Sequence, residues 1–282
     1  MSDAYPEPNK LDLHKLQQFL KWTVYTLLIV NWGFYIAEDW TRASHALTDE
    51  SSLLHWARQF AVSIDELAWF LLLFMFELET YVLEAEDWTG WARRVVHGIR
   101  LLCFVMIAHT VFAYVNSMVD LQTTAPVEDT SSLCDLIDRD LSFVHNLDYT
   151  ELTEANCKTL SSATNLYWVA DYPVVTDETG LELERDLALA DIFEVTAWLL
   201  VIVAIEVVVR LQDRGIAGGT LMKTLNHAKI FLYLFILSIG IYWASLGHWL
   251  YLWDEFLWIG GFIAIETNLS GWRNELREEA GD

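Results

Sequence analysis

Six long apolar stretches constrain this chain more than any other feature of its sequence. Each has seventeen or more residues with few charges, which is enough for an α-helix to cross a hydrocarbon core of about 30 Å. Many of the 14 tryptophans and 11 tyrosines lie near the ends of these stretches, as amphipathic rings do at membrane interfaces. Because open sheets cannot sit in lipid, we predict an all-α membrane protein with six transmembrane helices. They cover approximately Phe19–Tyr35, Ile64–Leu83, Ile99–Met118, Ile192–Val209, Ile230–Leu246 and Leu250–Leu269.

The spans predict five parts of the chain. A polar N-terminus (1–18) precedes the first helical hairpin and the third span (19–119). An acidic loop domain (120–190) separates the third and fourth spans. Spans four to six (191–270) are followed by a polar tail (271–282).

The distribution of lysine and arginine predicts the orientation. If the N-terminus is cytoplasmic, twelve of the 17 basic residues fall on the cytoplasmic side, as the positive-inside rule requires. We therefore expect a multi-pass protein of the plasma membrane, as in a bacterial inner membrane. Both termini would be cytoplasmic and the loop domain extracytoplasmic.

The loop domain holds much of the acid in a chain with a net charge of −23. Its segment Asp120–Asp186 has fifteen Asp and Glu against three Lys and Arg. Two interpretations stay open: a solvated domain, or a surface that concentrates cations. No basic patch is present for nucleic acid.

The loop domain also contains two of the three cysteines, Cys134 and Cys157. An extracytoplasmic compartment permits disulfides, so we predict a bridge between them rather than two free thiols. Cys103, inside the third span, is expected to be an apolar filler. Because the loop is too long for a simple connection, we expect short helices in it, for example over Ser131–Phe143 and Leu181–Leu189.

The even-numbered spans share a pattern: an acid, a tryptophan four residues later, and a glutamate eight residues after that. The pattern predicts three helical hairpins arranged as a pseudo-threefold repeat about an axis along the membrane normal. Its three copies are Asp65–Trp69–Glu77, Glu194–Trp198–Glu206 and Asp254–Trp258–Glu266.

The repeated acids predict two layers of carboxylates. Along a helix the glutamate lies about 18 Å beyond the first acid and about 120° around from it, so the two do not pair. A carboxylate inside a membrane is costly and usually faces a bundle interior or water. The alternative for Glu206 is an ion pair with Arg210, one turn later. Glu77 and Glu266 would likewise be structural if their spans end beside them.

His109 lies in the middle of the third span. A histidine there can relay protons or sense pH, or it can hydrogen-bond a carboxylate across the bundle.

These features favour an ion channel or transporter with an acid-lined pathway for cations or protons. Its outer mouth would hold Asp65, Glu194 and Asp254, its inner part Glu77, Glu206 and Glu266, and His109 would lie between them. The alternative is a non-transporting sensor or assembly partner that binds through its acidic loop. The expected partners are the lipid bilayer and inorganic cations, with the oligomeric state open. No cofactor is predicted, and no Walker A, HExxH, GxSxG or CxxCH motif supports an enzymatic activity. A membrane enzyme, which would need a lined pocket that no motif predicts, is the third and weakest alternative.

Overall fold

The computed structural model describes residues 9–78, 90–170, 172–214, 216 and 218–263. The chain forms two compact units. The first comprises Met1–Gly33 and Ala197–Asp282, and the second comprises Phe34–Thr196. Two long helices, α1 (Asn9–Ala46) and α6 (Glu178–Asp213), contribute one part to each unit.

Three helices among the described residues are long and apolar enough to cross a membrane. They lie at Gly90–Gln122, Glu178–Val208 and Thr220–Ser245. The first is α4, the second belongs to α6 and the third is α7. They carry the third, fourth and fifth predicted spans, as expected of a helical membrane protein.

The remaining helices of the second unit are shorter. After α1 come α2 (Leu53–Gln59) and α3 (Ala61–Glu77), and α3 packs along α4. Phe60 separates α2 from α3.

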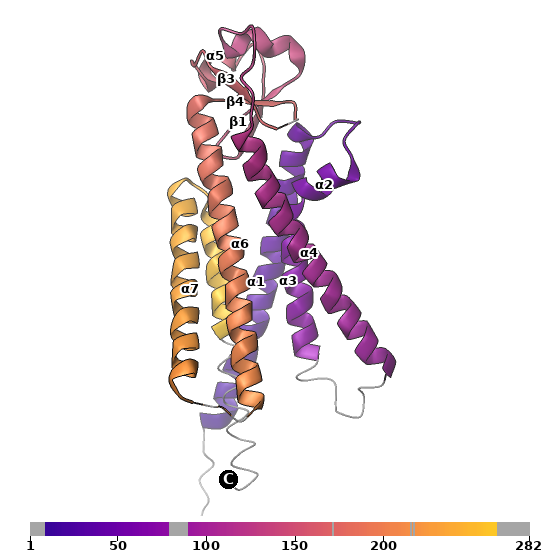
Figure 1. Cartoon of the computed structure of the whole chain (residues 1–282), viewed down its shortest axis with the longest axis vertical. Helices are drawn as coiled ribbons and strands as arrows, with labels where there is room; N and C mark the ends of the chain where they lie inside the picture. The colour runs from indigo at the N-terminus through magenta and orange to yellow at the C-terminus, as the bar shows by residue number, and fades with distance from the viewer. Residues whose placement is uncertain (1–8, 79–89, 171, 215, 217, 264–282) are drawn as a thin grey trace, which may run out of the picture. The chain divides into compact units, whose positions relative to one another are not determined.

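A small sheet corrects the all-α prediction. Four strands follow α4: β1 (Ser142–His145), β2 (Asp148–Glu151), β3 (Leu166–Trp168) and β4 (Val174–Asp177). Their order is β2-β1-β4-β3, with β1 parallel to β4 and the other pairs antiparallel. These strands are short runs that contain β-branched and aromatic residues, which favour sheets. The prediction of helices in the loop did not take this preference into account. We call residues 123–177 the sheet domain; it lies at the ends of α4 and α6 (Figure 1).

The sheet domain has its own apolar core. Leu133 and Leu136 of the 3-10 helix η2 (Leu133–Arg139) pack with Phe143 and Val175 of the sheet and with Cys157 of α5 (Cys157–Leu160). A second cluster of Leu121, Leu181 and Ala188 joins the ends of α4 and α6. The sheet domain is therefore packed onto those two helices.

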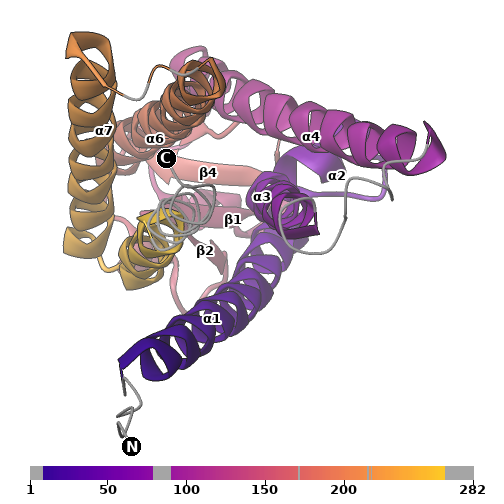
Figure 2. The same ribbon diagram turned by 90° about the horizontal axis from the view of Figure 1, so that it is seen from below.

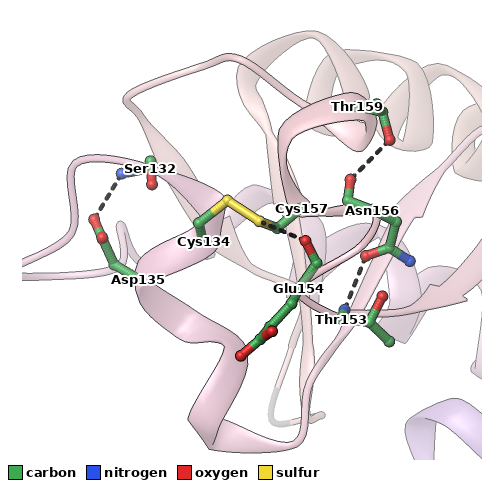
Figure 3. Close-up of a disulfide and its surroundings, with 8 residues drawn as sticks. All are labelled: Ser132, Cys134, Asp135, Thr153, Glu154, Asn156, Cys157 and Thr159. Carbon is green, nitrogen blue, oxygen red and sulfur yellow. Dashed lines mark hydrogen bonds between the residues drawn. A yellow bond between two sulfur atoms is a disulfide. The ribbon is translucent and has the colours of Figure 1, made fainter.

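The predicted disulfide is confirmed. Cys134 and Cys157 are bonded across 23 residues, with their Cα atoms 5.0 Å apart (Figure 3). Cys134 lies in η2, and Cys157 begins α5. The bridge therefore joins two short elements that pack in the same core. Cys103 is a buried free thiol.

The two short helices expected in the loop need correction. Only Leu133–Arg139 of the first is helical, as η2, and β1 occupies its last residues. Leu181–Leu189 is helical, but it belongs to the continuous helix α6. Asp177 starts α6 by accepting hydrogen bonds from the Gly180 amide and the Thr179 hydroxyl, both 2.8 Å, as an N-cap residue does.

In the first unit, α7 and the helical residues 249–263 lie side by side (Figure 2). The turn between them has Gly247 in the left-handed region, φ 102°, and the His248 amide donates to the Trp243 carbonyl at 3.0 Å. This is a Schellman ending, which favours glycine. The helices approach closely at Gly240, where an added Cβ would lie 3.2 Å from Leu252 Cα.

Candidate functional site

Three acids of α6 share one face of the helix within the second unit. Glu184, Asp191 and Glu194 are separated by seven and three residues, which places them within about 80° of each other around the axis. From the first to the last, the row extends about 15 Å along the helix. We call these three residues the acid stripe.

The stripe begins beneath the sheet domain. Glu184 is 5% exposed, and its Oε1 accepts a hydrogen bond of 2.9 Å from the Leu147 amide. Leu147 and Asn146 form the β1–β2 turn, both in the left-handed region (φ 59° and 58°). Burial raises the pKa of Glu184 to about 7, although backbone hydrogen bonds and the charge of Arg42 oppose this rise.

Arg42, on α1, is the cation that acts on this region. Its charge interacts with Glu184 and Asp191 of the stripe and with Asp39, one turn earlier on α1. It also interacts with Tyr149 of β2, whose pKa is raised by burial. One guanidinium therefore faces acids from two helices and a tyrosine of the sheet.

The stripe continues through Asp191 and Glu194 to Asp65 on α3. The charges of Glu184 and Glu194 both act on Asp191, and that of Glu194 also acts on Asp65. Asp65 Oδ2 accepts a hydrogen bond of 3.0 Å from Trp69 Nε1, one turn later. The buried Oδ1 of Asp65 has no hydrogen-bond partner among the described residues. The structure thus brings together two of the predicted outer acids, Asp65 and Glu194.

Asp254, the third predicted outer acid, belongs to the first unit. It is buried and accepts a hydrogen bond from the Asn31 side chain. Its neighbour Glu255 is also buried and accepts from Trp198 Nε1 at 3.5 Å. The first unit therefore has a buried carboxylate pair of its own.

His109, on α4, lies in the field of a cation. Arg58 of α2 is the charged group that acts on it. Neither ring nitrogen forms a hydrogen bond within the part of the chain that the structure describes. The expected bond to a carboxylate is therefore not found among these residues. The hydroxyl of the next residue, Thr110, donates to the Met106 carbonyl at 3.2 Å.

The structure describes the three predicted inner glutamates to different extents. Glu206 forms an ion pair with Arg210 at 2.6 Å, and the two side chains are 55% and 70% exposed. This is the pairing expected if Glu206 is structural. Glu77 is the last residue of α3, and its side chain is not among those that the structure describes. Glu266 lies outside the described residues.

Sequence reasoning did not select Glu184, Asp39 or Arg42. The spacing of Glu184, Asp191 and Glu194 was available as a signal, but it is recognisable only once α6 is known to start at Glu178. The contribution of α1 depends on packing that no local pattern encodes.

The described residues contain no group of three or more His, Cys, Asp or Glu placed to hold a metal ion. Comparison of the chain with protein families, curated proteins and solved structures finds no match. Functional inference therefore rests on the geometry of the site itself.

Proposed function

We propose that the chain is an integral membrane protein that moves protons or other cations, with the acid stripe and Asp65 as the entrance of the pathway. The observation that carries this proposal is the row of carboxyl groups in which each interacts with the next, from Glu184 to Asp65. Buried ionisable groups in membrane helices are expensive and mark ion or proton pathways. The charge of Arg42 acts on Glu184 and on Asp191 of the stripe.

The proposed membrane arrangement has six spans in three hairpins, with both termini in the cytoplasm of a bacterial-type cell. The sheet domain, within the predicted loop domain 120–190, then lies outside. Glu184 faces this outer side, and the stripe leads from there into the membrane. The excess of basic residues on the other side supports this orientation.

The pseudo-threefold repeat is part of the same proposal. Two copies carry an Asp-Glu pair, at Asp65–Glu66 and Asp254–Glu255. Glu66, Asp254 and Glu255 are buried, and the tryptophan of each copy is buried as well, at Trp69, Trp198 and Trp258. Similar burial of corresponding residues supports a common origin of the copies.

The mechanism requires each carboxyl group to accept a proton from one side and release it to the other. Glu184 would take protons from the outer solution, since its pKa of about 7 makes both protonation states accessible. Asp191 and Glu194, one turn apart on the same face, would pass them to Asp65. The Trp69 indole positions the Asp65 carboxyl at the end of the row.

Proton flux in liposomes tests the proposal. The purified protein is reconstituted around a pH-sensitive dye, and a potassium gradient with valinomycin drives protons inward. Asp65→Asn and Glu194→Gln should abolish most of the flux, whereas Glu182→Gln, an exposed acid on the same helix, should retain it. Folded Asp65→Asn and Glu194→Gln proteins with wild-type flux would overturn the proposal. Replacing external sodium by an impermeant cation separates proton from sodium movement.

The inner glutamates need a separate measurement. If Glu77, Glu206 and Glu266 line the inner part of the pathway, the triple glutamine variant loses flux. Unchanged flux in a folded triple variant would restrict the pathway to the outer acids.

A second candidate function is a sensor or assembly partner that does not transport. The exposed ion pair of Glu206 with Arg210 favours it, because that glutamate then needs no role in a pathway. The disulfide-bonded sheet domain would be the binding part. Absence of flux in wild-type liposomes, together with saturable binding of an extracytoplasmic partner, would select this function.

A further inference from the structure

Helix α2 is firmly attached on one side to the rest of its unit. Arg58 forms an ion pair of 2.5 Å with Asp120 near the end of α4, and the Arg58 side chain is only 10% exposed. Gln59 is buried, and Ser52 caps the helix by accepting from the His55 amide at 3.3 Å. The position of α2 against α4 is therefore fixed by an ion pair and by packing.

Several apolar side chains of α2, and one of α1, are nevertheless exposed. Leu53, Leu54 and Trp56 are 89%, 51% and 40% exposed, and Trp40 of α1 is 62% exposed. The Trp56 and Phe60 rings stack at 6.2 Å, and the Trp40 ring lies 6.2 Å from Phe60 and 6.4 Å from Trp56. We call these five residues the apolar shelf. Such a surface in water would be unfavourable.

The ion pair shows at which level of α4 the shelf lies. The apolar stretch of α4 ends at Met118, two residues before Asp120. Around this end, α4 exposes the apolar side chains of Phe112, Val115 and Val119. The segment immediately before α2, Thr48–Ser52, is polar. The shelf therefore lies where an apolar helix surface meets polar chain, the level at which tryptophan is enriched in membrane proteins.

We propose that α2 is an interfacial helix, whose apolar shelf is inserted into the boundary between headgroups and acyl chains of the outer phospholipid leaflet. A short amphipathic segment with leucine and tryptophan on one face binds this boundary. The polar residues of Thr48–Ser52 remain in the aqueous layer. This inference depends on the membrane location of the chain but not on ion movement.

The placement of α2 also fixes the depth of Asp65. Because α3 begins directly after Phe60, Asp65 lies about 7 Å further along that helix. If the shelf marks the membrane boundary, the Asp65 carboxyl lies just inside it. The end of the proposed pathway entrance is then close to the outer solution.

Labelled cysteine variants in phosphatidylcholine liposomes test the inference. Leu53→Cys and the matched control Glu50→Cys, an exposed polar position of the same connection, are each made with Cys103→Ser and labelled with the fluorophore NBD. Bromine on the lipid acyl chains should quench the label at position 53 and leave that at position 50 unchanged. Iodide in the water should quench position 50 and not position 53. Leu54→Cys gives a second reading should Leu53→Cys not fold.

Two results would overturn the inference. One is iodide quenching at position 53 equal to that at position 50, without quenching by brominated lipid. The other is a label at position 53 that is shielded from iodide but is not quenched by brominated lipid. If this shielding disappears when the protein is diluted in lipid, the shelf is covered by a second copy of the chain.

Discussion

Asp39 on α1 accepts two hydrogen bonds from Ser63, in the first turn of α3. The Asp39 Oδ2 atom lies 2.9 Å from the Ser63 amide nitrogen and 2.7 Å from the Ser63 hydroxyl. The residue before α3, Phe60, has no side-chain group that can cap the helix. The first amides of a helix need acceptors, and negative charge is favoured there. A residue 24 positions away in the sequence therefore supplies the cap.

Removal of this cap should destabilise the protein. We expect Asp39→Ala to lower the free energy of unfolding by about 1–3 kcal/mol, since a buried amide loses its acceptor. Asp39→Asn should lose less, because the amide oxygen can still accept. Ser63→Ala, which keeps the backbone bond, is the matched control. Thermal unfolding in detergent measures the series, and equal midpoints for Asp39→Ala and wild type would contradict the capping role.

Gly180, in the first turn of α6, has no room for a side chain. A Cβ there would collide with the Thr176 hydroxyl and lie 3.2 Å from His145 Nδ1. Thr176 cannot move freely, because its hydroxyl donates to the Val144 carbonyl at 2.7 Å. Gly180→Ala should therefore cost about 1–3 kcal/mol. Gly98→Ala, on α4 with no atom within 4 Å of the new Cβ, is the control and should be neutral or stabilising.

The elements predicted best from the sequence are those with a strong local signal. The apolar runs of α4, α6 and α7 exceed the length of most soluble helices and indicate their location directly. The bridge between Cys134 and Cys157 follows from their occurrence in one loop. By contrast, β1 and β4 are four residues each, too short for a periodic pattern to distinguish them from a helix.

The candidate site was predictable only in part, for a physical reason. Asp65 and Glu194 are visible in the sequence as acids at the start of apolar runs. Asp39 and Arg42 follow the first apolar run, and α1 simply continues to Ala46 through them. Their partners on α3, α6 and the sheet are fixed by tertiary packing, so their role could not be read from the sequence.

The disulfide should stabilise the sheet domain. In the chain-entropy model, closing a loop across 23 residues contributes about 3 kcal/mol. Cys134→Ser with Cys157→Ser should therefore make residues 123–177 accessible to a protease at lower urea concentration than in wild type. Cys103→Ser, which removes the free thiol of α4, is the control. Equal proteolysis of the double variant and wild type would show that the apolar core alone holds the domain.

Glu184 should make stability depend on pH. Burial raises its pKa in the folded chain from 4.5 to about 7, so the folded chain retains a proton that the unfolded chain releases between these values. The free energy of unfolding therefore falls as pH rises from about 4.5 to 7, by up to about 3 kcal/mol. Glu184→Gln cannot titrate and still accepts from the Leu147 amide, so its stability should decline less across this window. Unfolding at a series of pH values, with the exposed Glu182→Gln as control, measures the difference, and parallel curves for Glu184→Gln and wild type would exclude Glu184 as its source.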